Sequence, residues 1–529
     1  MVPAVEPFQL SLGEAAERLS NRQLSSRELV DSLFGRMDSV NSSVRAMVHR
    51  FDERARREAD AFDALRARGE VVGPLHGLPI TIKESMGTEG VPVTLGLAAR
   101  QDRPPASDAV LVALLRRAGA IVIGKTNLSQ LLLFHESENN IWGATANPYA
   151  LDRVPGGSSG GEAAAIAAGM SLCGIGSDIG GSIRVPCAWT GTAGLKPTAD
   201  RWSNAGSETA LMGQETIRGQ CGPMARHSAD VALLFRAIDP ASFAAFDPAV
   251  PPLPMPDPDE VDLSGLRVGL YEHDGFFPAS GPVARAVREA GRHLEAAGAI
   301  VVPFVPPEVE AGLDVYFGAL SSDGGATIEA QLEGEEVVPQ LQTLKQAAAL
   351  PSLVRRATAA WMGLRGEARV RRLLDALGKK PVEVYWKLAA QRNAIRLRTL
   401  AAWREAGIDA VLCPPHATVA LRHRDAGDFS LAGCYSMHYN LVNFPAGVVP
   451  VSRVGADEVP RTDARDRLEK KAQQVEEGSA GLPLGVQVVA RPYAEHVVLR
   501  LMKVIEARAA VEPGFPRLPP GALEKERKS

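Results

Sequence analysis

Residues 156–198 read "GGSSGGEAAAIAAGMSLCGIGSDIGGSIRVPCAWTGTAGLKPT" and contain two runs rich in glycine and serine. The first run, at 156–161, precedes an alanine-rich stretch typical of a buried helix. The second, at 174–182, begins in an apolar strand that ends at Ser177 and Asp178. Glycines before a helix can cradle a phosphate on free backbone N–H groups, or they can permit a turn that aims a hydroxyl at a reacting atom. The rest of the sequence must decide between these two uses.

Known phosphate-binding motifs fit this segment poorly. A Walker A loop, GxxxxGK[ST], needs a lysine after its last glycine, and no lysine follows these glycines. The GxGxxG spacing also fails, because Ile179 stands where the third glycine belongs. The pattern therefore favours a turn that presents a hydroxyl group.

Ser182 is the candidate nucleophile of that turn. Two adjacent glycines before it allow successive backbone N–H groups to point the same way, as an oxyanion hole requires. A serine hydroxyl needs a base, yet the ten histidines are scattered and none lies in a triad-like motif. Lys83 ends the apolar run "PITIK", where burial would disfavour its charged form and lower its pKa. We therefore take Lys83 as the candidate base.

Each of these features also has an ordinary structural explanation. A glycine-rich turn is more often only a turn, and a lysine that closes an apolar strand is usually a solvated strand end. The combination of both glycine runs with Lys83 carries the functional interpretation.

Composition limits the class of protein. The 529 residues are 45% hydrophobic and 23% charged with a net charge of −4, which is typical of a globular protein and not of a nucleic-acid binder. The five cysteines are odd in number and form no CxxC pair, so we expect neither disulfides nor a zinc site, and a reducing compartment. No signal peptide and no apolar run of about 18 residues is found. We expect a cytoplasmic protein.

The order of strand-like and helix-like segments predicts an α/β fold. Residues 78–85 and 120–128 are typical of strands, and 282–304 of an amphipathic helix followed by a buried strand. Residues 384–415 predict a long helix before a strand, and 484–509 a strand before a helix. The proline-rich segment 247–265 is the candidate linker between two halves of one sheet. We expect a single domain over 1–529.

The glycine runs and Lys83 together resemble the amidase signature family. That family uses a lysine, a serine in a cis peptide on one glycine-rich turn, and a nucleophilic serine on the next; Lys83, Ser158 and Ser182 match these positions. The family's signature block runs without interruption through 156–198. The resemblance implies the amidase-signature fold, a large twisted mixed β-sheet core flanked by helices on both faces, with a catalytic core over 70–230.

Within the family the sequence is most similar to the fatty acid amide hydrolases, from about residue 73 to 508. The matching stretches include "VTLGLAAR", "GPMAR", "SSDGG", "NFPAGVVPV" and "GLPLGVQVVA". Two departures exist: membrane-anchored animal members begin with a transmembrane helix that this sequence does not predict, and Ser321 replaces a phenylalanine of their acyl channel. Amide hydrolysis is therefore more strongly implied than long-chain preference.

The resemblance and the residue chemistry together imply a mechanism. Neutral Lys83 would draw a proton through the Ser158 hydroxyl from Ser182, which attacks the amide carbon and forms an acyl-enzyme. The developing oxyanion would be held by the N–H groups of Ile179, Gly180, Gly181 and Ser182. Four residues around these groups would hold the turns in place: Ser159, Ser177, Asp178 and Arg184. We expect an ion pair between Asp178 and Arg184. No metal or organic cofactor is needed.

Three functions stay open at this point. The first is hydrolysis of fatty acid amides such as N-acylethanolamines, and the second is hydrolysis of short, aryl or peptide-like amides by the same mechanism. The third is a non-catalytic binding protein or a subunit of a complex that delivers ammonia to a charged tRNA. The presence of the lysine and both serines argues against a catalytically inactive member of the family. We expect a small-molecule amide as partner and no nucleic acid, and a homodimer is an open alternative.

Residues 339–380 carry nine basic and two acidic residues on a chain that is acidic overall. Apolar residues, including Trp361, lie among the charges, so the segment predicts a basic amphipathic helical cap. It falls where the resembling hydrolases carry a membrane-facing cap. One interpretation is a peripheral contact with an anionic membrane through residues such as Arg369, Arg371 and Arg372; the other is a solvated cap that packs on the enzyme body.

Overall fold

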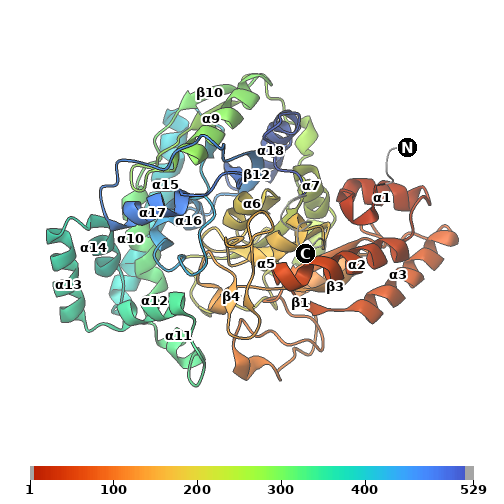
Figure 1. Cartoon of the computed structure of the whole chain (residues 1–529), viewed down its shortest axis with the longest axis horizontal. Helices are drawn as coiled ribbons and strands as arrows, with labels where there is room; N and C mark the ends of the chain where they lie inside the picture. The colour runs from red at the N-terminus through yellow and green to blue at the C-terminus, as the bar shows by residue number, and fades with distance from the viewer. Residues whose placement is uncertain (1–4, 519–529) are drawn as a thin grey trace.

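The computed structural model describes residues 5–518, and its centre is an eleven-stranded mixed β-sheet (Figure 1). In spatial order the strands are β1 (Met47–Arg50), β3 (Ile121–Thr126), β2 (Pro79–Lys83), β6 (Cys173–Asp178), β8 (Gln220–Ala225), β7 (Ala193–Lys196), β12 (Ala446–Arg453), β13 (Pro483–Ala490), β11 (Ala410–Cys413), β9 (Arg267–Leu270) and β10 (Ile300–Pro303). A separate hairpin joins β4 (Glu138–Asn139) and β5 (Gly143–Ala144). The predicted mixed sheet is confirmed.

Helices surround this sheet. Those before residue 300 are α1 (Leu12–Ser20), α2 (Ser26–Val44), α3 (Asp52–Ala67), α4 (Val110–Arg117), α5 (Gly160–Ala167), α6 (Arg184–Thr190), α7 (Ser228–Arg236), α8 (Pro240–Ala244) and α9 (Gly281–Glu295). Those after it are α10 (Val309–Leu320), α11 (Ala326–Gln331), α12 (Pro339–Ala349), α13 (Ser352–Leu364), α14 (Ala368–Ala376), α15 (Val382–Glu405), α16 (Cys434–Leu441), α17 (Arg467–Glu476) and α18 (Glu495–Ala509). Short 3₁₀ turns are η1 (Pro7–Gln9), η2 (Ala98–Arg100), η3 (Gln130–Leu132), η4 (Pro258–Glu260) and η5 (Ser430–Gly433).

Helices α6 and α18 cover opposite faces of the sheet. Gly447 of β12 lies against Met502 of α18 and pairs with Val488 of β13. Gly485, three residues before Val488 on the same strand, lies against Ala188 of α6. Because side chains alternate between the faces of a strand, these two contacts are on opposite sides. The prediction of helices on both faces is confirmed.

Local sequence explains where several of these elements begin. Helices α1 and α2 both start with a Ser-x-x-Glu capping box, in which the Ser11 and Ser25 hydroxyls accept the N–H of the glutamate three residues later. Helix α5 is different, because all eight of its residues are buried and six are glycine or alanine. Such small side chains allow this helix to lie close to β2 and β6.

The strand order brings Lys83 near the second glycine run. Strand β2 lies between β3 and β6 and runs parallel to both. The carboxyl ends of parallel neighbours meet at the same edge of a sheet, so the end of β2 at Lys83 faces the end of β6 at Asp178. Residues 83 and 178 are thus brought together by backbone pairing before any side-chain contact is considered.

Two expectations for the chain after residue 240 have different outcomes. The segment 247–265 contains only the short turn η4, and strands on both sides of it enter the same sheet. The apolar run at 300–304 predicts a buried strand, and this is wrong: β10 is one of the two edge strands, and Ile300 is 43% exposed. An apolar run does not distinguish a central strand from an edge strand that has only one neighbour.

The predicted basic cap at 339–380 forms three short helices, α12, α13 and α14, and not one amphipathic helix (Figure 1). Two of its arginines are paired with the enzyme body. Arg369 bridges Asp466 and Glu469, and Arg372 bridges Glu310 and Asp314 of α10. The local charge excess is therefore partly neutralised by acids from distant segments, which a count over 339–380 does not include. Over residues 5–518, no helix combines the length and apolar character needed to cross a bilayer.

Candidate active site

Lys83, the predicted base, is completely buried at the end of β2. Its Nζ donates to the Ser158 Oγ at 2.7 Å and to the Ser177 Oγ at 3.0 Å. Burial disfavours the ammonium form and lowers the pKa of Lys83 to about 7, although nearby acids favour the charge. A large fraction of Lys83 is thus neutral near pH 7, in direct contact with a serine hydroxyl.

Ser158 lies on the first glycine run, and the Gly157–Ser158 peptide is cis, as the resemblance implies. The next residue connects this turn to the second glycine run through two contacts. The Ser159 N–H donates to the Ser182 carbonyl at 3.1 Å, and the Ser159 Oγ donates to the Ser177 carbonyl at 3.2 Å. The two glycine-rich turns, at 156–161 and 174–182, therefore pack directly against each other.

The second turn carries Ser182, which is 5% exposed. Gly181 has a φ of +116°, a conformation that favours glycine, and its N–H donates to Asp178 Oδ1 at 2.8 Å. The Gly181 N–H, one of the predicted oxyanion donors, therefore already has an acceptor. The other predicted donors are the N–H groups of Ile179, Gly180 and Ser182.

Asp178 and Arg184 form the ion pair that the sequence analysis expects, with no exposed surface on either side chain and a shortest contact of 2.8 Å. Burial would raise the pKa of Asp178, but the Arg184 guanidinium and the backbone N–H of Gly181 hold it well below its usual value. Arg184 is also anchored by residues far along the chain, since it donates to Gln487 Oε1 at 2.6 Å and to the Asn440 side chain. Asp178 of this pair also accepts the N–H groups of Gly181 and Ile183, so it fixes the turn on both sides of Ser182 in the sequence.

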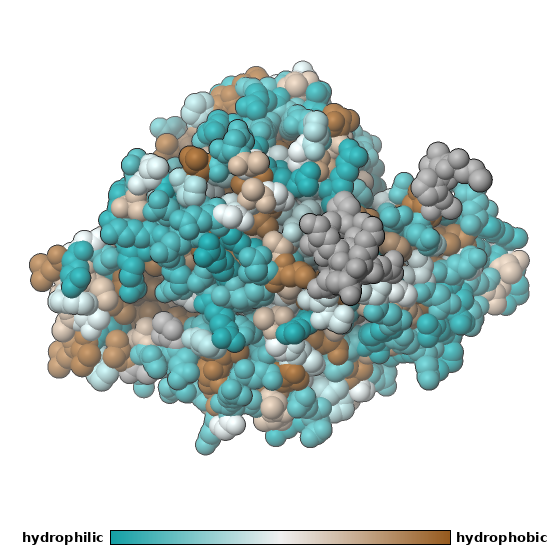
Figure 2. Space-filling model, viewed as in Figure 1, coloured by the Kyte–Doolittle hydropathy of each residue, from teal (hydrophilic) through white to brown (hydrophobic). Residues whose placement is uncertain are grey.

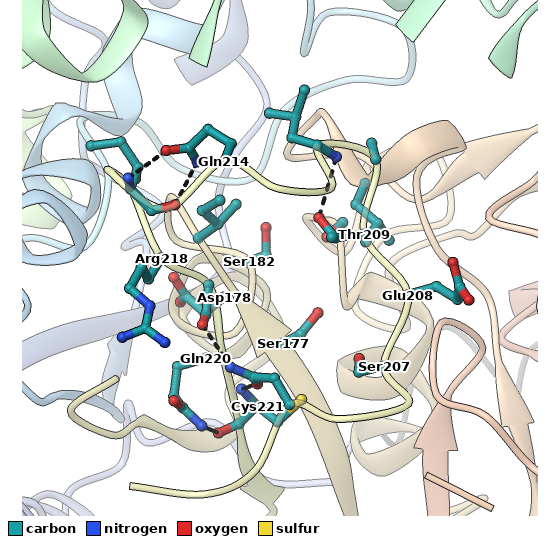
Figure 3. Close-up of a pocket in the computed structure, with 18 of the residues that line it drawn as sticks. Ser177, Asp178, Ser182, Ser207, Glu208, Thr209, Gln214, Arg218, Gln220 and Cys221 are labelled. Atoms are coloured by element: carbon teal, nitrogen blue, oxygen red, sulfur yellow. Dashed lines mark hydrogen bonds between the residues drawn. The ribbon is translucent and has the colours of Figure 1, made fainter. Parts of the chain in front are cut away.

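Ser182 borders a cavity of about 240 Å³ that polar and apolar side chains line together (Figure 3). Ser158 and Ser177 line it, and Figure 3 shows Arg218 and Glu208 on opposite sides of the two serines, Ser177 and Ser182. Further polar groups around the cavity are Asn204, Ser207, Thr209, Gln214, Glu215 and Gln220. This cavity suits the hydrogen-bonding part of a ligand.

Ser182 also borders a second, mainly apolar cavity of about 140 Å³. Its apolar lining comprises Leu132, Leu133, Phe134, Ile179, Leu211, Phe317, Leu320, Ile328, Leu344, Leu377, Ala426 and Met437. Ser321, which replaces the expected phenylalanine, lines it as well. A ligand held across Ser182 would therefore have one apolar end and one end that can also form hydrogen bonds.

The structure thus brings together the residues that the sequence analysis selects. It also adds four that the analysis missed: His135, Tyr316, Asn440 and Gln487. Each is a single residue in an unremarkable stretch, so no local pattern could have identified it. Among residues 5–518, no group of three or more His, Cys, Asp or Glu side chains could hold a metal ion.

Comparisons with known proteins identify the family of this chain. The sequence model of the family described as Amidase matches residues 28–499. Fatty-acid amide hydrolase 1 from Sus scrofa is 36% identical over 440 residues, which is 82% of this chain and 76% of the relative. A glutamyl-tRNA(Gln) amidotransferase subunit from Synechococcus sp. strain CC9605 is 32% identical over 519 residues, 96% of this chain and 97% of the relative. A solved structure of fatty acid amide hydrolase has a TM-score of 0.85 at 26% identity, and covers 97% of this chain and 87% of its own.

Proposed function

The chain belongs to the amidase family and is an amide hydrolase, and we propose that it cleaves amides with Ser182 as nucleophile, Ser158 as proton relay and Lys83 as base. One observation carries this assignment. The buried Lys83 amine contacts the Ser158 hydroxyl at 2.7 Å. The next residue of that turn, Ser159, is hydrogen-bonded to the backbone of Ser182, the proposed nucleophile. A buried lysine with a pKa of about 7 is suited to accept a proton at neutral pH.

The proposed reaction has two stages. Neutral Lys83 takes a proton from Ser158 as Ser158 takes one from Ser182, and the Ser182 oxygen bonds to the amide carbon. The N–H groups of Ile179, Gly180 and Ser182 stabilise the oxyanion, and the C–N bond breaks as the amine receives the proton. Water then attacks the acyl-enzyme with the same relay as base, which releases the acid and restores the Ser182 hydroxyl.

The two cavities at Ser182 favour substrates with an apolar acyl group. We propose that the acyl chain occupies the cavity of about 140 Å³ and that the amine lies in the cavity of about 240 Å³, where most of the hydrogen-bonding side chains are found. Similarity to fatty-acid amide hydrolase 1 supports fatty acyl amides as the substrate class.

The size of the apolar cavity supports shorter acyl or aryl amides as the second candidate class. A dry cavity of about 150 Å³ holds a benzene ring, so a phenyl or six-carbon acyl group fills this space. A further cavity of about 30 Å³ shares Ile328 and Leu344 with this one and reaches Lys345, and we propose that longer chains continue into it. The amidotransferase-subunit function would need no such apolar cavity.

The cap offers an apolar surface beside its charges. On α13, Leu353 and Leu364 are 79% and 88% exposed, and Trp361 is 51% exposed. Figure 2 shows hydrophobic atoms gathered at the end of the molecule where Figure 1 places α13. We propose peripheral contact of this helix with an anionic lipid surface, which co-sedimentation with phosphatidylserine vesicles tests; Trp361→Glu should weaken it, and binding equal to that of the wild type would refute the contact.

The assignment of Ser182 is tested with a fluorophosphonate probe and a series of acyl p-nitroanilides of increasing chain length. Ser182→Ala should lose both labelling and turnover while its thermal unfolding stays cooperative. The matched control is Ser207→Ala, which removes another serine of the same cavity and should remain labelled. Labelling that persists in Ser182→Ala would refute the proposal, and hydrolysis of glutamine but of no p-nitroanilide would favour the amidotransferase-subunit function.

A further inference from the structure

Two side chains from outside the glycine-rich turn bind its backbone carbonyls. The Tyr316 hydroxyl, from α10, donates to the Ile179 carbonyl at 3.2 Å. His135 Nε2, from the loop after η3, contacts the Gly180 carbonyl at 3.1 Å. Both side chains line the apolar cavity and are almost buried, at 4% and 9% exposure. Neither takes part in the proton relay described above.

The hydrogen-bond roles of both groups are fixed by their partners. A carbonyl oxygen only accepts, so the Tyr316 hydroxyl must donate and His135 must carry its proton on Nε2. Burial lowers the pKa of His135 to about 4, so the imidazole is neutral near pH 7. Its ring packs edge-on against the ring of His416, with centroids 5.4 Å apart, which limits its rotation. Both donors are therefore held in one orientation.

These contacts determine where the turn's N–H groups point. A peptide unit is planar, so its N–H points opposite to its carbonyl. The Tyr316 contact with the Ile179 carbonyl thus sets the direction of the Gly180 N–H. The His135 contact with the Gly180 carbonyl does the same for the next N–H, which donates to Asp178.

The turn needs such restraints because glycine has the most freely rotating backbone. Gly180 and Gly181 carry no side chains that could hold the turn by packing. A Cβ atom at position 180 would collide with the Tyr316 hydroxyl, which shows how closely Tyr316 approaches the turn. Asp178 accepts the Gly181 N–H of the turn, and Tyr316 and His135 bind its Ile179 and Gly180 carbonyls.

We propose that Tyr316 and His135 are positioning residues: Tyr316 orients the Gly180 N–H to stabilise the oxyanion, and His135 supports that orientation by holding the next peptide unit, whose Gly181 N–H stays on Asp178. The inference rests on the proposed role of Ser182. It predicts that the two side chains affect the transition state and not the binding of the substrate. Removal of a complete oxyanion-hole donor costs on the order of 10²–10³ in rate, and loss of its orientation should cost less, on the order of tenfold.

The test uses Tyr316→Phe, which removes only the hydroxyl, and the pair His135→Leu and His135→Gln, of which the second keeps an N–H donor. Tyr271→Phe is the matched control, because it removes a buried phenol that contacts Tyr439 at 3.0 Å. With heptanoyl p-nitroanilide, kcat should fall about tenfold in Tyr316→Phe and His135→Leu, with KM changed less than twofold, and His135→Gln should recover part of the loss.

A second measurement separates positioning from cavity shape. Hexyl trifluoromethyl ketone forms a hemiketal oxyanion with a serine, whereas the corresponding alcohol cannot. Inhibition by the ketone should weaken by the same factor as kcat, and inhibition by the alcohol should not change. Equal weakening of both inhibitors, or wild-type kcat in both Tyr316→Phe and His135→Leu, would overturn the inference. Either result, combined with an inactive Ser182→Ala, would leave the proposed function intact.

Discussion

Replacing Lys83 by methionine should abolish activity and stabilise the folded protein at and below pH 7. Burial lowers the pKa of Lys83 from 10.5 to about 7. This change in pKa corresponds to about 5 kcal/mol. The wild type is less stable by that amount at a pH where the lysine is charged in both the folded and the unfolded chain. Loss of the two hydrogen bonds to Ser158 and Ser177 costs about 1 kcal/mol each, so the net gain is about 3 kcal/mol.

The gain should shrink as the pH rises. Between pH 7 and 10.5 the unfolded chain keeps a proton that folded Lys83 has released, so wild-type stability increases with pH in this window. Methionine does not titrate, and the difference in unfolding free energy between the variant and the wild type should fall by about 2 kcal/mol from pH 7 to pH 9. Urea unfolding of both proteins at pH 6, 7, 8 and 9 measures this difference.

Lys125→Met provides a control outside the proposed relay. Lys125 is buried in β3 and donates to the Pro92 carbonyl at 3.1 Å, and burial lowers its pKa to about 8. The difference in unfolding free energy between Lys125→Met and the wild type should therefore begin to fall about one pH unit higher. Identical pH dependence of stability in the wild type and Lys83→Met would refute the conclusion that Lys83 is neutral above pH 7 in the folded protein.

Three further changes have defined outcomes. Lys83→Ala should lower kcat at pH 7 on the order of 10²–10⁴-fold, and its residual rate should keep rising with hydroxide concentration, whereas the wild-type rate should rise only up to about pH 7 and be level above it; an unchanged pH–rate profile would exclude Lys83 as base. Asp178→Asn leaves Arg184 buried without its counter-charge and should destabilise the protein by about 3–5 kcal/mol, seen as a lower unfolding midpoint. Ile328→Trp should slow hydrolysis of dodecanoyl p-nitroanilide more than of acetyl p-nitroanilide, because it narrows the path beyond the apolar cavity; equal effects on both substrates would contradict that path.

The sequence predicts the sheet and the central residues of the site because both depend on local patterns. Apolar runs mark β2 and β6, and the two glycine runs mark the turns that carry Ser158 and Ser182. The ends of parallel neighbours must meet, so the approach of Lys83 to the second turn also follows from strand order.

What the sequence could not predict depends on contacts between distant segments. The charge count over 339–380 does not reveal that Arg369 and Arg372 pair with acids 58 to 100 residues away. Tyr316 lies 137 residues from the carbonyl that it contacts, and no periodicity marks it. Exposure of β10 depends on its having one neighbour, which is a property of the whole sheet.

The anchoring of Arg184 has a consequence for the order in which the protein acquires its activity during synthesis. Lys83, Ser158 and Ser182 are all translated within the first 182 residues, but the groups that hold Arg184 follow 252 to 303 residues after it, at Ser436, Asn440 and Gln487. A ribosome-bound chain therefore carries the reactive groups long before it can anchor Arg184 beside the turn that bears Ser182. Hydrolytic activity should emerge only when nearly the whole chain has been made, so a truncated translation product would hold the complete set of reactive side chains and remain inactive.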